Sequence, residues 1–179
     1  MEIEKLIKKA EELSQKYGVP YYEVRIAKIS ATHIEMQNSH FEDISSNIEI
    51  GIGVRAFDGS WGFSSANDMR RAGKAIETAM KIAKATKGNS KIYTGDPVRD
   101  NAEIRVKKPF SEVDLEEKID LLKELDSLLM GENLPNRKIA YGDGIKEQFY
   151  FNAHLDILAD ISSENHPHQS FNTNARKSK

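Results

Sequence analysis

The sequence predicts an α+β fold, in which a mostly antiparallel sheet is packed by helices. Three observations support this prediction. Apolar residues recur at three- and four-residue steps in three separate segments, which is typical of amphipathic helices. Across 21–66 they alternate with polar residues, which is typical of strands. These strand-like segments are grouped rather than interleaved with helices, so we expect about three helices, a meander of about four strands and a C-terminal hairpin.

Each predicted helix is bounded by residues that commonly start or stop helices. Gly18 can take the left-handed conformation that ends the first helix. Asn67 or Asp68 is a suitable N-cap for the second. Ser111, with Asp114 three residues later, resembles a capping box that opens the third. The predicted helices are 2–17, 69–86 and the segment from 111 to the closing glycine at 131.

The strand prediction is clearest at 48–57, where isoleucines, a valine and an alanine share one face. Asp58-Gly59 then predicts a two-residue hairpin turn of the primed type. A polar turn at 37–40 separates two earlier strands, and the alternation in the first of them blurs at 28–32. The other strands are predicted at 21–36, 41–45 and 60–65.

The C-terminal third gives weaker signals. Asp143-Gly144 predicts a second hairpin turn, flanked by strands at 139–141 and 145–151. The connector 89–110 holds a candidate short strand at 102–106, and 153–161 could be a short helix or a strand. From 162 onward the sequence has one large apolar residue, Phe171, too little to offset the entropy of ordering. We therefore expect a domain over 1–152 and a divergent, poorly ordered tail over 153–179.

Composition excludes several classes of function. Lys and Arg number 26 against 28 Asp and Glu, a formal charge of −2, so no basic face for nucleic acid is expected. The absence of cysteine removes disulfides, zinc ribbons and thiol nucleophiles. No run approaches the ~20 apolar residues of a membrane-spanning helix, and charges interrupt the N-terminus, unlike a secretory signal. We expect a cytoplasmic protein with no membrane or nucleic-acid partner.

The segment Gly51–Ala56 formally matches the dinucleotide-binding fingerprint. That fingerprint needs a helix immediately afterwards to hold the pyrophosphate, whereas Asp58-Gly59 turns this chain into another strand. A nucleotide-dependent enzyme would therefore require a helix starting near residue 56. The alternative is steric, because glycines at Gly51 and Gly53 leave one strand face flat enough for a backbone or side chain to approach.

No catalytic or metal-binding constellation stands out. His154 with Asp156 and Asp160, and the pair at 166 and 168, match no zinc spacing. His33 and His40 fall in or beside strands, without carboxylates in a metal-binding pattern. Ser64 and Ser65 lie in no nucleophile-elbow sequence. We expect no catalytic residue, no metal site and no cofactor in this chain.

One sheet face remains suggestive. The face of 48–57 that lacks isoleucines carries Glu49, the two glycines, Arg55 and Phe57, and Arg25 lies on the polar face of an earlier strand. Such a face or edge could accept an extended peptide or a partner strand. The alternative is that the domain's own helices cover it.

The run IEIGIGVRAFDGSWGFSSAN at 48–67, preceded by YYEVRIAK and followed by an alanine-rich helix, resembles the N-terminal domain of the TldD/PmbA family. PmbA is also called TldE and was named a modulator of DNA gyrase. The resemblance spans 2–152. It implies zinc-dependent proteolysis of unfolded or peptide substrates by a two-subunit assembly whose PmbA-type partner lacks the metal. It also implies that a His-Glu-x-x-x-His helix and a cysteine, downstream of this domain, hold the zinc.

This chain departs from that pattern because it has no His-Glu-x-x-x-His and no cysteine, so no catalytic or zinc-binding residue carries over. We expect a chain truncated before the catalytic domain, which serves as a scaffold or substrate channel and is inactive alone. Its expected partners are a TldD- or PmbA-type subunit, in a homo- or heterodimer, and unfolded peptide. The alternative is a stand-alone module that binds a peptide or partner through its sheet. The scaffold or substrate-facing residues implied by the resemblance are Arg25, Gly51, Gly53, Arg55, Asp58, Gly59, Gly62 and Phe63.

Overall fold

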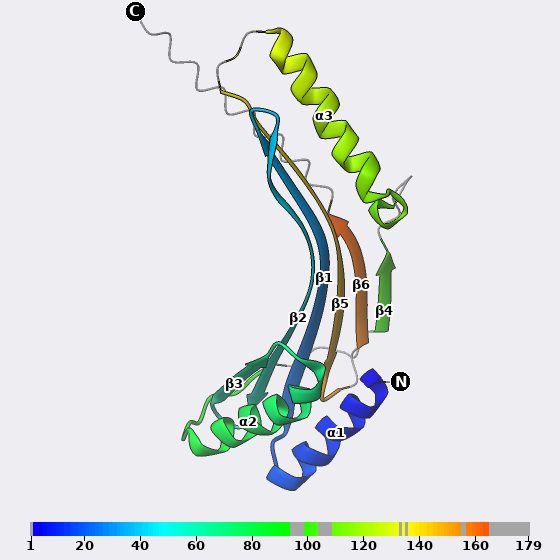
Figure 1. Ribbon diagram of the computed structural model, residues 1–179. Coiled ribbons are helices and arrows are strands. Elements are labelled where there is room, and N and C mark those ends of the chain that lie inside the picture. Colours follow the sequence, from blue (N-terminus) through cyan, green and yellow to red (C-terminus); the bar gives the residue numbers. More distant parts are fainter. Residues whose placement is uncertain are drawn as a thin grey trace, which may run out of the picture. The chain divides into compact units, whose positions relative to one another are not determined.

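The predicted α+β class is confirmed by the computed structural model, in which three α-helices accompany six strands of one sheet within the described residues (Figure 1). The sheet order is β3-β2-β1-β5-β6-β4. The structure describes residues 2–93, 99–103, 109–132, 134, 136–154 and 157–164. The elements are α1 (Glu2–Tyr17), β1 (Tyr21–Gln37), β2 (His40–Phe57), β3 (Trp61–Ala66), α2 (Ala72–Ala85), β4 (Arg99–Glu103), α3 (Leu115–Gly131), β5 (Lys138–Asn152) and β6 (Ile157–Glu164).

The chain folds into two compact units. Unit 1 comprises Met1–Lys28, Glu49–Glu103 and Glu147–Ser162, and unit 2 comprises Ile29–Ile48, Ile104–Lys146 and Ser163–Lys179. Strands β1, β2 and β5 each contribute residues to both units. No helix within the described residues combines the length and apolar character needed to cross a membrane.

In unit 1, α1 has the predicted bounds and ends as the sequence indicates. Gly18 has a φ of 61°, and the Val19 N–H returns to the Ser14 carbonyl at 3.1 Å. The Ser14 hydroxyl in turn donates to the Val19 carbonyl at 2.7 Å. Leu6, Ala10 and Leu13 are buried on the inward face of the helix. The left-handed glycine therefore reverses the chain into β1 while satisfying the last carbonyls of the helix.

Strands β1 and β2 form one long hairpin rather than the shorter pieces predicted. Asn38 and Ser39 connect them with φ angles of 48° and 69°, the signs required by a two-residue primed turn. The blurred alternation at 28–32 and the gap between 45 and 48 both lie inside continuous strands. Periodicity fails there because little is buried on either face of β2 between His40 and Ile48.

Strand β3 returns antiparallel to β2 as predicted, but the turn between them is one residue longer than expected. Phe57 pairs with Trp61, so Asp58, Gly59 and Ser60 form a three-residue loop. Gly59, the middle residue of this loop, has a φ of 72°, in the left-handed region that glycine adopts readily. The Asp58 N–H donates to the Ser60 carbonyl at 3.1 Å.

Helix α2 packs directly on β3 and beside α1 (Figure 1). The predicted cap is confirmed at Asp68, whose carboxylate accepts the Arg70 N–H at 2.9 Å, although a 3₁₀ turn at Met69–Arg71 precedes the α-helix. Its buried stripe consists mainly of alanines, so the helix can lie close to the sheet. A Cβ on Gly62 of β3 would overlap the backbone of α2 at Ala79 and Ala83, which explains the glycine.

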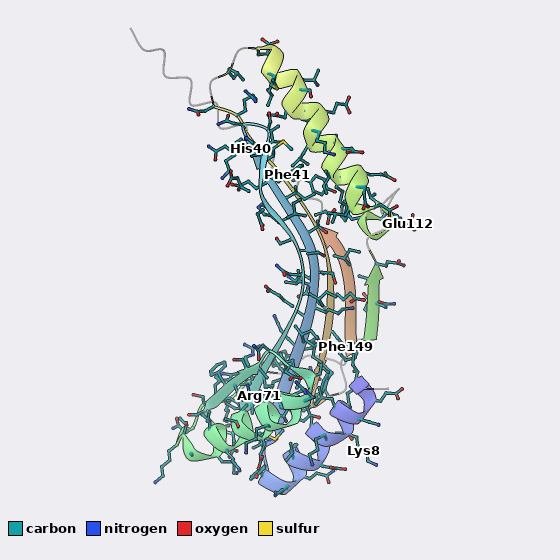
Figure 2. The ribbon with its side chains drawn as sticks, viewed as in Figure 1. Lys8, His40, Phe41, Arg71, Glu112 and Phe149 are labelled. Atoms are coloured by element: carbon teal, nitrogen blue, oxygen red, sulfur yellow. The ribbon has the colours of Figure 1, made fainter. Side chains whose placement is uncertain are left out.

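The core of unit 1 lies between these helices and one face of the sheet. Tyr22, Val24, Ile52 and Val54 supply the sheet side, and burial raises the pKa of Tyr22 to about 12, with Glu11 nearby adding to the effect. Phe151 of β5 is fully buried against Tyr22, and Phe149, labelled in Figure 2, packs against the same cluster. Apolar burial of this kind is the main stabilising term of the fold.

In unit 2, α3 packs on β1 and β5 through Leu122, with Ile34, Met36 and Ile139 on the sheet side. The helix begins at Leu115, with Asp114 as N-cap and no side-chain capping bond, so the predicted capping box at Ser111 is wrong. Residues Phe110–Glu112 form a 3₁₀ turn instead. The predicted end at Gly131 is confirmed.

The predicted hairpin turn at Asp143-Gly144 is wrong, because β5 runs without a break through both residues. The C-terminal strand pair is formed by β5 and β6, which are neighbours in the sheet. A Cβ on Gly144 would lie 3.3 Å from the Ser30 carbonyl oxygen, so this glycine lets β5 pack closely against β1. Asp143 meets Lys118 of α3 at 2.7 Å.

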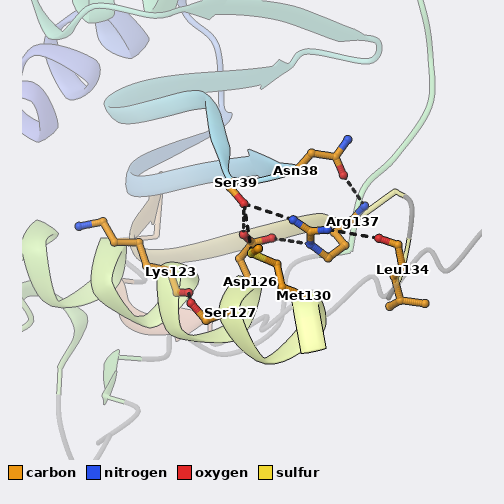
Figure 3. A network of polar contacts seen from close by, with 8 residues as sticks. All are labelled: Asn38, Ser39, Lys123, Asp126, Ser127, Met130, Leu134 and Arg137. Carbon is orange, nitrogen blue, oxygen red and sulfur yellow. Dashed lines mark hydrogen bonds and ion pairs between the residues drawn. The ribbon is translucent and has the colours of Figure 1, made fainter. Parts of the chain in front are cut away.

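A polar network fixes the β1–β2 turn onto α3, as Figure 3 shows. The buried carboxylate of Asp126 accepts from the Ser39 hydroxyl at 2.5 Å and from Arg137 Nε at 2.9 Å. Asn38 Oδ1 accepts the Arg137 backbone N–H at 2.8 Å. Burial alone would raise the pKa of Asp126, but the bonds from Arg137 and Ser39 outweigh it and hold the pKa below its usual value.

Strands β4 and β6 pair in parallel, with Arg99 opposite Ile157 and Glu103 opposite Ile161. The short connector strand therefore exists, displaced toward the N-terminus from its predicted range. The segment that could be a helix or a strand is a strand, and it reaches Glu164. Residues 165–179, the rest of the predicted tail, lie outside the described residues, and the domain boundary at 152 stays a prediction.

Candidate functional site

The open face of unit 1 is the side of β1, β2 and β3 that points away from α1 and α2. In β2, Ile52, Val54 and Ala56 are buried toward the helices, whereas Gly51, Gly53 and Arg55 are exposed. The strand period of two separates these sets cleanly. Among the described residues no helix covers the glycine-bearing face, so the open arrangement, and not the covered alternative, is found.

A groove of about 440 Å³ is hollowed into this face. The antiparallel register places Ser65 opposite Gly53, and Phe63 opposite Arg55, so that these side chains share the face. The structure thus brings together four of the predicted residues and separates the other four from the groove. The lining residues are Glu23, Arg25, Gly53, Val54, Arg55, Phe63, Ser64 and Ser65.

Arg55 is a fixed part of the groove wall. Its Nε donates to Glu23 Oε2 at 2.8 Å, its second nitrogen contacts the same oxygen, and its guanidinium lies 5.0 Å from the centre of the Trp61 ring. Tyr21 donates its hydroxyl to the other Glu23 oxygen at 2.9 Å. Burial, helped by Glu23, raises the pKa of Tyr21 well above its usual value. Glu23 is buried, and its charge is fully engaged by these partners.

Arg25 differs from Arg55 because no carboxylate within the described residues pairs with it. Its guanidinium lies 5.4 Å from the centre of the Tyr150 ring, a cation–π contact that holds the side chain over β5. The residue is exposed and lines the groove. A guanidinium carries five N–H donors, so this one retains hydrogen-bonding capacity toward a ligand.

The floor of the groove is flat. A Cβ built on Gly53 or on Gly51 meets nothing within 4 Å, so these glycines leave open space rather than permit internal packing. Phe63 beside them is a large apolar side chain with 58% of its surface exposed. Such a surface suits an extended chain whose backbone lies over the floor and whose apolar side chain contacts the phenyl ring.

The remaining predicted residues have structural roles. Asp58 pairs with Lys84 of α2 at 2.7 Å, and a Cβ on Gly59 would overlap the backbone of Gly88. Gly62 allows α2 to approach β3. Gly51 lies on the open face but does not line the groove. Four of the predicted residues therefore line the groove, three belong to its supporting hairpin, and their substrate-facing or scaffold role stays a prediction.

Sequence reasoning missed Glu23, Tyr150 and Trp61 as functional neighbours. Glu23 was visible on the polar face of its strand, but its pairing with Arg55 joins two strands and depends on register. Tyr150 comes from β5, which follows more than a hundred residues later in the sequence. No local pattern reveals such contacts.

The nucleotide-binding alternative is excluded by the path of the backbone. Strand β2 continues through Arg55 to Phe57 and pairs with β3, so no helix begins near residue 56. A phosphate cradle at a helix N-terminus cannot form there.

The donor groups of the described residues do not fit a zinc site. They contain no group of three His, Cys, Asp or Glu residues that could hold a metal ion. His33 and His40 are exposed, the latter at the start of β2 (Figure 2), and His154 lies 5.8 Å from Tyr21, ring centre to ring centre. Asp156 and the histidines at 166 and 168 lie outside the described residues, as does the side chain of Asp160.

A second hollow, of about 470 Å³, lies in unit 2 between β1 and β5. It is lined by Ile29, Ala31, Thr32, His33, Ala140, Tyr141, Gly142, Asp143, Gly144, Ile145 and Lys146. Its carboxylate, Asp143, is engaged by Lys118 and by the Tyr141 hydroxyl at 2.7 Å. It lacks the exposed arginine and phenyl ring that line the groove of unit 1, which remains the better candidate.

Comparison with known proteins confirms the resemblance inferred from the sequence. Residues 22–83 match the family model described as PmbA/TldA metallopeptidase domain 1. A curated metalloprotease of Methanothermobacter thermautotrophicus is 23% identical over 141 residues, which cover 78% of this chain and 31% of that protein. The matched family segment contains the whole β2–β3 hairpin and all the residues that line the groove.

Solved structures share the fold. A protein from Bacteroides thetaiotaomicron, described as a putative modulator of DNA gyrase, superimposes with a TM-score of 0.71 at 19% identity, over 89% of this chain and 38% of its own. A putative modulator of a DNA gyrase from Thermotoga maritima superimposes with a TM-score of 0.70 at 14% sequence identity. The match covers 90% of this chain and 37% of that protein. TldE from Thermococcus kodakarensis superimposes with a TM-score of 0.65 at 17% sequence identity. That match covers 91% of this chain and 37% of TldE. The chain thus spans about a third of the length of the relatives it matches.

Proposed function

We propose that this chain, which carries the match to PmbA/TldA metallopeptidase domain 1, is the substrate-facing scaffold of a metallopeptidase system of that family in the cytoplasm. The observation that carries the proposal is the open groove of unit 1, with its glycine floor, exposed phenyl ring and arginine. In this role the chain binds and orients an unfolded peptide. Bond cleavage belongs to a zinc-bearing TldD-type polypeptide, with which this chain or its parent assembles.

The groove can hold an extended peptide without unfolding any of its own structure. The Arg55–Glu23 pair and the Trp61 ring fix one wall, so little side-chain entropy is lost when a ligand binds. Gly53 admits a backbone close to the sheet, and Phe63 contributes apolar contact area. An unfolded segment presents the exposed backbone and side chains that such a surface needs, whereas a folded protein does not.

Binding of an unfolded peptide to the whole chain tests the proposal. Trp61 is the sole tryptophan and lies 6.2 Å from Phe63, ring centre to ring centre, so its fluorescence reports on the groove. We expect titratable binding that Gly53→Val weakens about tenfold by filling the floor. The matched control is Gly131→Val, which adds the same side chain at the end of α3, where a Cβ also meets no atom within 4 Å and which lies outside the groove lining.

Two results would contradict the proposal. Equal binding by Gly53→Val and the original chain would separate peptide binding from the groove. Zinc-dependent cleavage of the peptide by this polypeptide alone would refute its role as a non-hydrolytic scaffold, and the reaction can be followed by mass spectrometry.

A stand-alone peptide- or partner-binding module is the second candidate, favoured by the same open face. The two functions differ in their need for a partner subunit. Size-exclusion chromatography with light scattering, on a mixture with a TldD-type or PmbA-type subunit, separates them: a stoichiometric complex supports the scaffold role, and a chain that binds peptide but stays monomeric supports the module.

A further inference from the structure

The charges that line the groove of unit 1 do not cancel. Its lining contains two guanidinium groups, of Arg25 and Arg55, and one carboxylate, of Glu23. That carboxylate is used completely, since one oxygen takes Arg55 and the other takes the Tyr21 hydroxyl. The groove therefore keeps one uncompensated positive charge, which is the guanidinium of Arg25.

The position of Arg25 suits a carboxylate. Its guanidinium lies over the Tyr150 ring, which restrains the side chain while leaving the N–H edge free. Planar guanidinium groups bind carboxylates through two parallel hydrogen bonds. Ser65, opposite the Gly53 floor, adds a hydroxyl on the same face. The arrangement is positively charged, has donors on two strands, and has an apolar contact at Phe63.

The flat floor indicates that the ligand chain passes through the groove. Gly51 continues the open floor along β2 beyond the groove lining, and a Cβ added to it would have no other atom within 4 Å. An extended backbone lying there continues in both directions from the Arg25 position. The carboxylate that reaches Arg25 is then a side chain within the peptide rather than its terminus.

We infer that the groove selects unfolded segments in which an internal Asp or Glu reaches Arg25 while a nearby apolar side chain contacts Phe63. This inference rests on the proposed function and names the class of peptide that it takes. A basic segment would place like charges together at Arg25, and a neutral one would leave its donors to water.

Three peptides test the inference, two with both ends capped and one with a free C-terminus. Their binding is followed by Trp61 fluorescence. The first is acetyl-Gly-Leu-Gly-Glu-Gly-Gly-amide, the second replaces Glu by Gln, and the third is the Gln peptide with a free C-terminal carboxylate. We expect the Glu peptide to bind the whole chain about five- to tenfold more tightly than the Gln peptide at low salt, since a charge-assisted bond at an exposed site strengthens binding modestly. The preference should shrink at 0.5 M salt.

Variants assign the preference to one residue. Arg25→Gln should abolish it and Arg25→Lys should restore part of it, while Arg71→Gln, which removes an exposed arginine outside the groove, should leave it intact. Equal affinity for Glu and Gln peptides, or a preference that survives Arg25→Gln, overturns the inference. Tighter binding of the free-carboxylate peptide through Arg25 also overturns it, in favour of a C-terminal carboxylate.

The outcomes keep the two proposals distinguishable. If the Glu and Gln peptides bind equally and Gly53→Val weakens both, the acidic preference fails and the groove remains the peptide site. If neither peptide binds, the proposed function fails together with the preference.

Discussion

Lys118 of α3 and Asp143 of β5 form an ion pair of 2.7 Å whose side chains are only 7% and 6% exposed. The Tyr141 hydroxyl also donates to Asp143 at 2.7 Å, and burial together with this carboxylate raises the pKa of Tyr141 well above its usual value. The pair ties the only α-helix described in unit 2 to the sheet through a contact that excludes water. A buried charge without its partner is strongly unfavourable, so removal of either Lys118 or Asp143 alone should destabilise the fold.

Lys118→Met should therefore lower the free energy of unfolding by about 3–5 kcal/mol, because it leaves the buried Asp143 charge without a cation and with only the Tyr141 hydroxyl as partner. The double variant Lys118→Met/Asp143→Leu should recover part of that loss, since an apolar pair needs no charge compensation. Urea denaturation followed by circular dichroism measures both. The control is Lys123→Met on the same helix, whose side chain is 57% exposed. Equal stability of the two lysine variants would contradict the prediction.

Gly62→Ala should destabilise unit 1 by about 3 kcal/mol, because the added methyl group overlaps the α2 backbone at Ala79 and Ala83. Gly53→Ala, on the neighbouring strand, meets no atom within 4 Å and should change the stability by less than about 0.5 kcal/mol. Thermal unfolding of both variants makes the comparison. A Gly62→Ala protein as stable as Gly53→Ala would show that α2 does not lie directly on β3.

The Asp126 carboxylate should make unit 2 sensitive to acid. Its pKa is lower in the folded chain than in the unfolded one, so its contribution is fully present above an ordinary Asp pKa of about 3.9 and is lost as the pH falls below that value. Asp126→Asn should lower the free energy of unfolding by about 2 kcal/mol at pH 7. The difference in unfolding free energy between the variant and the original chain should become smaller toward pH 3. Chemical denaturation across pH 3–7 measures it.

The matched control for Asp126 is Asp120→Asn on the same helix. The Asp120 side chain is 72% exposed and pairs with Lys123 on the surface, so its replacement should have little effect at any of these pH values. A pH-independent cost for Asp126→Asn would mean that the carboxylate charge does not contribute to the network of Ser39 and Arg137.

Asp58→Asn should have a small effect, although the residue belongs to the motif that carries the family resemblance. Its bond to Lys84 is 2.7 Å, but the two side chains are 34% and 43% exposed, and such pairs contribute less than ~1 kcal/mol. Peptide binding should not change, because Asp58 does not line the groove. A loss of more than tenfold in peptide affinity would contradict this assignment.

Local signals in the sequence predicted the elements that depend on local chemistry. The left-handed Gly18, the Asp68 cap and the alternation of β2 each act within a few residues, and each is confirmed. The prediction at Asp143-Gly144 was wrong for a tertiary reason. Asp143 is held by Lys118 and Gly144 lies against Ser30, so the dipeptide serves strand packing and not a turn.

For the candidate site, the sequence predicted which residues share a strand face but not which partners they contact. Strand alternation identified Gly53, Arg55 and Arg25 as members of a polar, flat face. It could not show that Arg55 is neutralised by Glu23 while Arg25 is not, because those partners depend on strand order and register. The difference between the two arginines, which carries the ligand inference, is therefore visible only in three dimensions.

The placement of β1 between β2 and β5 has a consequence during synthesis. When the hairpin of β1 and β2 has left the ribosome, the other side of β1 still lacks a neighbour, since β5 begins only at Lys138. A bare strand edge can pair with foreign strands and start aggregation. The nascent chain is therefore exposed to this hazard until Asn152 has emerged, and a chaperone that shields extended segments would raise the yield of folded product.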